Sequence, residues 1–361
     1  RHYQRGVAFY NKKQHIQAIE EYLQATTVRR DYPEAWLGLG LSFIRNGNPV
    51  GAEDAFRQAL SYRPDYTDAH YNIGILYYEE KHDGLAIQHL EQVGESVTVA
   101  PGACLALGVI YERQDKKAQA EASYLKAIRL DEDHAAAHRN LGLLYHNLDR
   151  FEEAITHYNH ALGIDSTMVA VYHNLALAYQ SQQADSLAIS VYETGRRFTS
   201  LDPQQLNTLG ILYQKQKLYA QAEKAFTDAL AANPTLLDAR FNLAVLLELR
   251  GDYTGAIETY QRIVALDSTY SEAYLNMGVL FKEFGDIEAA ITSYERLVML
   301  DTEYADAFFN LGILYQETER FGEALNAFQQ FLANSDDEDL EQQVMQVVEW
   351  IEARMKAVRM K

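Results

Sequence analysis

A glycine or alanine recurs every 34 residues along this chain without a break. Alanine returns twelve residues after each of these positions, and Tyr, Phe or Leu returns sixteen residues after each. This period is typical of a pair of short helices repeated as a solenoid. Two helices approach closely only where bulk is absent, so we expect the small residue of the first helix to face that of the second. The recurring positions are Gly6, Gly40, Gly74, Gly108, Gly142, Ala176, Gly210, Ala244, Gly278 and Gly312.

The second repeat shows the whole pattern most fully, in Trp36, Leu39, Gly40, Phe43, Ala52, Phe56, Ala59 and Pro64. This order resembles the tetratricopeptide repeat (TPR) family, and the resemblance covers residues 1 to about 338. It implies an all-α fold, a right-handed superhelical solenoid of ten 34-residue helix-turn-helix repeats. The first of these repeats is truncated by two residues.

The chain of 361 residues carries a net charge of −19, and its pI is near 5.0. Nucleic acid binding needs a basic surface that displaces counterions, so we expect no nucleic acid partner. A protein or peptide partner with basic or amphipathic character fits better, although acidity also serves solubility. The single cysteine, Cys104, excludes an internal disulfide and leaves the redox compartment undecided.

The chain begins two residues into its first repeat. A signal, a lipid anchor or further domains before Arg1 therefore stay open, and the sequence does not indicate a compartment. No apolar run approaches the length of a membrane span.

Two places depart from the pattern. Between Gly94 and Val99 a helix breaker meets a β-branched run, which predicts a loose or bent junction. Gly195 stands where alanine is usual, which indicates either drift between repeats or a local change of curvature.

Residues 339–361 form a separate segment after the repeats. Leu340, Val344, Val347, Ile351, Met355 and Val358 recur at steps of four and three, which predicts an amphipathic helix. The end of a solenoid exposes an apolar flank, so we expect this helix to cap the last repeat. The alternative is a helix offered to another chain.

In the TPR family the first helices line a concave groove, and the resemblance implies a peptide-binding surface there. Position six of the repeat is asparagine in Asn72, Asn140, Asn174, Asn242, Asn276 and Asn310. An amide both donates and accepts, so a ladder of amides suits an extended peptide backbone. A similar ladder lines the TPR superhelix of O-linked N-acetylglucosamine transferases. The other interpretation is that each asparagine ties one helix to its neighbour.

Positions five and nine of the repeat would border the same groove. Position five is mostly apolar early and late, and polar between, as in Tyr71, Arg139, His173, Phe241 and Phe309. Such a surface fits an amphipathic helix or a peptide with spaced apolar anchors. Position nine is aliphatic in every repeat, which indicates either an apolar floor or tight packing between first helices, and we expect the packing.

Position two carries carboxylates at helix starts, in Glu34, Asp68, Asp238, Glu272 and Asp306. Compensation of the helix dipole explains them, and together they would make both groove ends acidic. Chaperone-binding TPR domains use lysine at position two and asparagine at position nine, and this chain has neither. A heat-shock chaperone tail is therefore not the expected ligand.

We expect no catalysis, no cofactor and no metal site. Six histidines fall within residues 134–173, and His134/His138 and His157/His160 have a spacing that places two imidazoles on one helix face. No zinc-hydrolase, phosphate-loop or nucleophile motif accompanies them.

The sequence thus predicts a noncatalytic scaffold or adaptor that binds a peptide or protein along the groove. One alternative is a structural subunit of a larger or self-associated assembly. Another is the targeting portion of a longer protein whose other domains are absent.

Overall fold

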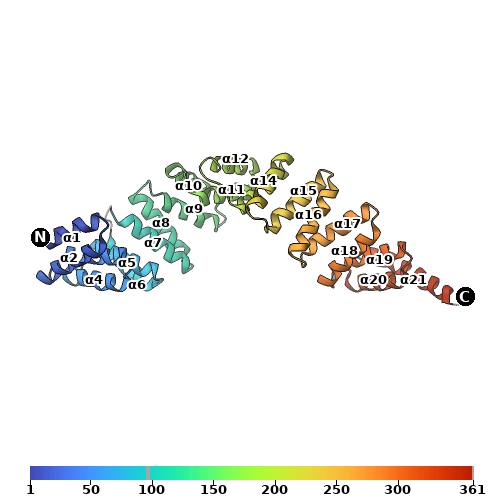
Figure 1. The fold of residues 1–361 in the computed structure, drawn as a ribbon, viewed down its shortest axis with the longest axis horizontal. Helices are drawn as coiled ribbons and strands as arrows, with labels where there is room; N and C mark the ends of the chain where they lie inside the picture. The colour runs from blue at the N-terminus through green and yellow to red at the C-terminus, as the bar shows by residue number, and fades with distance from the viewer. Residues whose placement is uncertain (95–97, 360–361) are drawn as a thin grey trace. The chain divides into compact units, whose positions relative to one another are not determined.

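The structure is a computed structural model that describes residues 1–94 and 98–359, with backbone alone at 358 and 359. The regular structure of these residues is helical throughout, which confirms the predicted all-α fold class. The helices follow one another in antiparallel pairs joined by short turns (Figure 1). None of the described helices has the length and apolar composition that crossing a lipid bilayer requires.

The chain divides into two compact units, of which unit 1 comprises Arg1–Ser200. Each helix pair of this unit corresponds to one 34-residue period of the sequence. Its helices are α1 (His2–Asn11), α2 (His15–Val28), α3 (Pro33–Arg45), α4 (Pro49–Tyr62), α5 (Thr67–Glu79), α6 (Asp83–Leu90) with the 3-10 turn η1 (Glu91–Val93), α7 (Ala100–Arg113), α8 (Lys117–Leu130), α9 (Ala135–His146), α10 (Phe151–Ile164), α11 (Val169–Ser181) and α12 (Asp185–Gly195).

Unit 2 comprises Leu201–Lys361 and continues the same pairing. Its helices are α13 (Pro203–Lys215), α14 (Tyr219–Ala232), α15 (Leu237–Leu249), α16 (Tyr253–Leu266), α17 (Ser271–Glu283), α18 (Ile287–Leu300), α19 (Ala305–Glu317), α20 (Phe321–Asn334) and α21 (Glu338–Arg359).

The recurring glycines make room for a large side chain of the second helix, and at Gly142 the backbone of the facing small residue Ala154 also lies close, 3.3 Å from where a Cβ would stand. A Cβ added at Gly142 would lie 2.7 Å from Cδ1 of Tyr158, sixteen residues later, and one at Gly210 would lie 2.5 Å from Cε1 of Phe226. A real Cβ does not approach a ring carbon so closely. The alanines twelve residues after the glycines are fully buried, but the neighbour that the glycine accommodates is the large residue.

The turn between the two helices of a pair has the same backbone in each repeat. Its residue at position fifteen has positive φ, and in repeat seven this residue is Lys217 with φ 60°. The next amide, that of Leu218, donates to the carbonyl of Tyr213 at 2.8 Å, as in a Schellman motif. The residues at this position are Lys13, Gly47, Lys81, Asp115, Asp149, Gln183, Lys217, Gly251, Gly285 and Glu319.

The two departures from the pattern have different outcomes. The predicted loose junction includes residues 95–97, which lie outside the described residues. Gly195 has a packing role, because a Cβ there would lie 2.9 Å from Cγ of Tyr172. The ring of Tyr172 in turn stacks on Phe198, with centroids 6.3 Å apart.

Helix α21 follows the last pair and contacts α20. Val344 and Ile351 are buried in the core cluster of α18 to α20, and Leu340, Val347 and Met355 pack against it. The side chains of the remaining predicted positions at the end of this segment, 358–361, lie outside the described residues. Whether α21 acts as a cap stays a prediction.

Candidate peptide-binding face

The first helices of neighbouring repeats contact each other within unit 1, and α13 contacts α15 in unit 2. Within each unit, we call the surface formed by positions two, five, six and nine of the first helices the first-helix face. The predicted site residues on it are all half-buried, so each contacts both protein and solvent. They are Tyr71, Asn72, Arg139, Asn140, His173, Asn174, Phe241, Asn242, Asn276, Phe309 and Asn310.

In unit 2 the asparagines of this face bind protein groups. Asn242 Nδ2 donates to Asn207 Oδ1 at 2.9 Å, which links α15 to α13. Asn276 Nδ2 donates to the Tyr260 hydroxyl at 2.7 Å, which links α17 to α16. Asn310 donates to a carbonyl of its own helix at 2.8 Å and accepts from Lys282 Nζ at 3.1 Å.

In unit 1 the asparagines contact their own helix, a neighbouring side chain or a tyrosine of the preceding second helix. Asn72 Nδ2 donates to the carbonyl of Asp68 at 2.7 Å, and Asn140 Oδ1 accepts from Arg139 Nε at 3.0 Å. Asn174 lies beside Tyr158 and acts to lower the pKa of that phenol, which burial raises. A primary amide offers two donors and two acceptor lone pairs. Half-buried amides with one or two protein contacts therefore keep capacity for a ligand.

Two of the asparagines belong to a repeated Glu–Tyr–Asn arrangement that the sequence analysis missed. The Tyr260 hydroxyl donates to Glu248 Oε1 at 2.5 Å while it accepts from Asn276. Four repeats earlier, Tyr124 donates to Glu112, and Asn140 lies on the same hydroxyl. The sequence feature that marks this arrangement is a glutamate at position twelve together with a tyrosine at position twenty-four of the same repeat.

Burial dominates the electrostatics of this arrangement. It raises the pKa of Tyr260, and the hydrogen bond to Glu248 raises it further. Burial also raises the pKa of Glu248, with a contribution from the nearby carboxylate of Glu283. The two tyrosines therefore stay neutral and act as hydrogen-bond donors.

The aliphatic residues at position nine are only partly covered. None of the ten is fully buried, and Leu143 and Val279 are 38% and 40% exposed. Ile75, Val109 and Ile313 each pack against a core cluster with part of their surface. Tight packing between first helices therefore stays a prediction for these residues. Their partial exposure leaves apolar surface on the same helices as the asparagines.

The position-five side chains also pack partly into the repeats. Phe241 contacts the rings of Tyr260 and Tyr270, with centroids 5.7 and 5.6 Å apart. Phe309 lies 5.4 Å from the Phe331 ring centroid. Tyr71 places its hydroxyl where a Cβ on Gly102 would lie 2.8 Å away.

The polar position-five residues make hydrogen bonds instead. Nδ1 of His173 lies 2.6 Å from the Tyr192 hydroxyl, and Arg139 donates to Asn140. Phe241 and Phe309 thus pack against rings, whereas Arg139 and His173 form hydrogen bonds.

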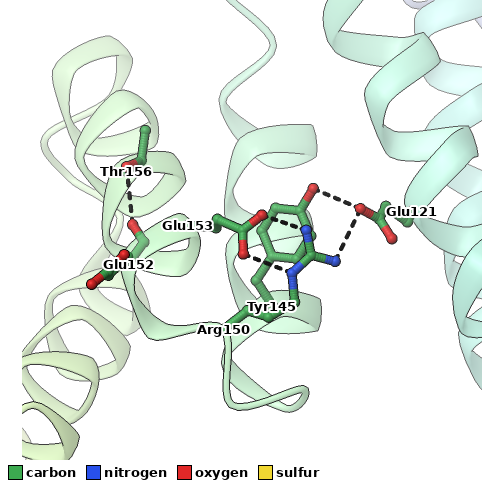
Figure 2. A network of polar contacts seen from close by, with 6 residues as sticks. All are labelled: Glu121, Tyr145, Arg150, Glu152, Glu153 and Thr156. Atoms are coloured by element: carbon green, nitrogen blue, oxygen red, sulfur yellow. Dashed lines mark hydrogen bonds and ion pairs between the residues drawn. The ribbon is translucent and has the colours of Figure 1, made fainter.

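A second polar network joins repeats through second helices. Figure 2 shows Arg150 between Glu153 and Glu121, with its guanidinium 4.1 Å from the centroid of the Tyr145 ring. The Tyr145 hydroxyl donates to Glu121 Oε1 at 2.9 Å, and burial followed by this bond raises the pKa of Tyr145 to about 12. The network ties α8 to α9 and α10, which indicates a structural role.

The histidines contact one another both across helices and along α10, where the ring centroids of His157 and His160 lie 6.5 Å apart. His138 Nδ1 lies 2.9 Å from His157 Nδ1, and the rings of His138 and His160 stack with centroids 5.1 Å apart. His134 accepts from the amide of Ala137 at the start of α9. Within the described residues no group of three or more His, Cys, Asp or Glu side chains has an arrangement that could hold a metal ion.

Family profiles described as tetratricopeptide repeat match residues 37–95, 105–168 and 207–271, more than half of the chain. The chain belongs to the tetratricopeptide repeat family. Further TPR profiles match residues 6–47, 280–319 and 306–337. Proteins of this family are generally noncatalytic scaffolds that bind protein or peptide partners.

One solved TPR structure shares the fold, and others match less closely. The C-terminal part of a TPR repeat-containing protein from Cytophaga hutchinsonii matches with a TM-score of 0.60 and 18% identity, over 67% of this chain and 99% of that one. YrrB, described as a TPR protein with an unusual peptide-binding site, matches with a TM-score of 0.46 and 20% identity, over 52% of this chain and 96% of that one. Yeast Tom70 matches with a TM-score of 0.41 and 14% identity, over 98% and 96% of the two chains. No curated protein matches this TPR chain.

Proposed function

We propose that this TPR chain is a noncatalytic scaffold that binds an extended segment of a protein partner along its first-helix face. The observation that carries the proposal is the pairing of half-buried asparagine amides with a partly exposed aliphatic strip on the same helices. Amides bind a peptide backbone without regard to its sequence, and the aliphatic strip receives apolar side chains.

The test uses a peptide selected from a random phage-displayed library on the intact chain, titrated against wild type and the variant Asn242→Ala, Asn276→Ala, Asn310→Ala. Each lost amide contact is worth about 0.5–1.5 kcal/mol, so we expect affinity to fall at least about tenfold. The matched control replaces three exposed amides of second helices, in Gln221→Ala, Gln261→Ala and Gln329→Ala, and keeps the wild-type affinity.

The asparagines also bind Asn207, Tyr260 and Lys282, so we expect the triple variant to lose some thermal stability. Binding is therefore measured at a temperature at which circular dichroism shows both proteins folded. A folded variant that binds the selected peptide as tightly as wild type refutes the proposal. The asparagines would then serve only to join helices, as in a structural subunit.

A further inference from the structure

Tyrosines and carboxylates alternate at the starts of the first helices in unit 2. We call Asp238, Tyr270, Glu272, Tyr304 and Asp306 the acid–tyrosine stripe. Burial raises the pKa of Tyr270, and the carboxylates of Glu272 and Asp238 raise it further. Burial also raises the pKa of Tyr304, with contributions from Asp306 and Glu272. Each tyrosine therefore lies in the field of carboxylates from its own repeat and from the following one.

The same repeat positions in unit 1 already hold a guanidinium. Arg63 places Cζ 4.5 Å from the centroid of the Tyr66 ring, and its Nη2 donates to the carboxylate of Glu34. Tyr66 stands at the repeat position of Tyr270 and Tyr304, and Glu34 at that of the stripe carboxylates. One repeat earlier, Arg29 lies over Tyr32 at 5.2 Å. The tyrosine at position thirty-four and the carboxylate at position two of a repeat thus form a site that accepts an arginine side chain. We call this pair the corner.

Unit 2 has the corner without the arginine. The residues at the repeat position of Arg63 are Asp267 and Asp301. Asp267 accepts from the amide of Thr269 at 2.9 Å, and Asp301 accepts from the amide of Glu303 at 3.0 Å, so both lie in the turns between repeats.

The stripe carboxylates are open to solvent. Asp238, Glu272 and Asp306 are all exposed, whereas Glu34 is half-buried beside its arginine. Within the described residues, no basic side chain pairs with these three carboxylates or stacks on Tyr270 or Tyr304. The dipole of a helix explains a carboxylate at its start, and packing against the core explains part of each tyrosine ring. Neither accounts for the match between this pair and the tyrosine and carboxylate that bind Arg63 in unit 1.

The geometry points to the acid–tyrosine stripe as a binding site for arginine side chains of a basic peptide segment. One guanidinium stacks on Tyr304 between Glu272 and Asp306, and a second stacks on Tyr270 between Asp238 and Glu272. Arginine fits better than lysine because its planar guanidinium stacks on a ring while it donates two hydrogen bonds to a carboxylate. The assignment rests on the proposed function, since the stripe begins the same helices α15, α17 and α19 that carry Asn242, Asn276 and Asn310.

The repeat spacing sets the spacing of the arginines. Helices do not pack closer than about 8–10 Å, which sets the smallest distance between neighbouring corners, and an extended peptide advances about 3.3 Å per residue. Neighbouring corners therefore match arginines about three residues apart. Beyond Asp306 a hollow of about 760 Å³ continues the acidic surface, lined by Asn334, Ser335 and residues 336–339 among others. The net charge of −19 attracts such a peptide over a longer range.

The test is fluorescence anisotropy of the labelled peptide GRAARAARG with the intact chain at low ionic strength. We expect the same peptide with citrulline for arginine to bind at least about tenfold more weakly, and the lysine peptide to bind with intermediate affinity. The variant Glu272→Gln removes the carboxylate shared by both corners and weakens binding at least about fivefold. The control Glu258→Gln removes an exposed carboxylate from α16 and keeps wild-type binding.

A second variant introduces into unit 2 the arginine that unit 1 has at the same repeat position. Asp301→Arg places an arginine at the position of Arg63, so we expect it to occupy the corner at Tyr304 and to weaken peptide binding about tenfold, with an unchanged circular dichroism spectrum. Wild-type binding by Asp301→Arg or by Glu272→Gln overturns the assignment. Equal weakening by Glu272→Gln and Glu258→Gln also overturns it, because net charge alone would then explain the binding.

The two proposals fail in different ways. If the library-selected peptide depends on the asparagines while GRAARAARG ignores the stripe variants, the first-helix face binds peptides but the arginine site is wrong. If GRAARAARG depends on the stripe while the asparagine variant keeps full affinity for the library peptide, the arginine site is supported and the amide ladder is refuted.

Discussion

Acidification is expected to open unit 1 at the paired histidines of α9 and α10. Nε2 of His138 faces the carbonyl of Glu132 at 3.2 Å, and a carbonyl only accepts, so this nitrogen carries the proton. Nδ1 of neutral His138 must then accept from Nδ1 of His157 at 2.9 Å. Burial, followed by the neighbouring His138 and His160, lowers the pKa of His157 to about 4, and only Glu153 opposes this.

The direction and size of the effect follow from this pKa. An unfolded histidine has a pKa of about 6.5, so between pH 6.5 and about 4 the unfolded segment binds a proton that the folded one does not. Stability is therefore complete above pH 6.5 and is lost as the pH falls. At pH 5 the loss from His157 amounts to about 2 kcal/mol, or a roughly thirtyfold larger open population.

Hydrogen exchange of α9 and α10, corrected for intrinsic rates, measures this opening at pH 7 and pH 5. The variant His157→Gln keeps a donor for His138 but does not titrate, so we expect most of the pH-dependent loss to disappear. The control His82→Gln alters an exposed histidine and retains the wild-type loss. An equal loss of protection in His157→Gln and wild type would show that the histidine pair does not control the opening.

Three further predictions concern the repeats. Gly142→Leu forces a side chain into the Tyr158 ring and costs about 3 kcal/mol or more, so exchange protection falls in that repeat, and unchanged protection there contradicts the packing. Lys217→Gly relieves a positive φ and raises the melting temperature of the chain by an amount equivalent to about 1 kcal/mol, while Gly251→Lys lowers it; equal melting of both variants refutes the strain. Removal of 339–361 uncovers the apolar flank of α20 and causes aggregation or earlier melting in light scattering and calorimetry, whereas a monomer with unchanged melting indicates a partner-binding tail.

The fold could be predicted from the sequence because one constraint recurs without a break. A glycine under a ring leaves a single register for each helix pair, and the period of 34 residues repeats that register along the chain. The sequence did not indicate that the nearest neighbour of the glycine is the large residue sixteen positions later, since periodicity shows which positions recur but not which of them touch. The ring of Tyr158 over Gly142 required the helix geometry itself.

The turn backbone was hidden from the sequence for a related reason. Glycine marks the positive φ only at Gly47, Gly251 and Gly285, while lysine, aspartate, glutamine and glutamate take the same conformation elsewhere. The Schellman hydrogen bonds and the packed helices impose the left-handed conformation there and outweigh a local preference of about 1–2 kcal/mol. Residue identity is therefore a weak guide wherever tertiary packing dictates φ.

The candidate site was only partly predictable. Position-six asparagines were visible from spacing, but the bond from Asn276 to Tyr260 depends on side-chain directions that spacing does not give. The carboxylates at position two had a sufficient explanation in the helix dipole. Their proposed role in binding arginine follows only from the contact of Arg63 with the Tyr66 ring. The sequence does not show that a residue three positions before a tyrosine folds back over its ring.

The residue at position thirty-one of a repeat therefore decides whether the carboxylate at position two is paired within the chain or stays exposed to a partner. Where position thirty-one is arginine, as at Arg63, the charge of position two is neutralised internally and Glu34 is half-buried. Where it is aspartate, as at Asp301, the turn gains a hydrogen bond from its own backbone while Glu272 stays exposed. The backbone of the repeat is the same in both cases, so the exchange changes the surface without altering the register of the helices. Because Asp301 keeps the turn hydrogen-bonded without a cation, the acidic corner persists in the folded protein and its charge remains available to a partner.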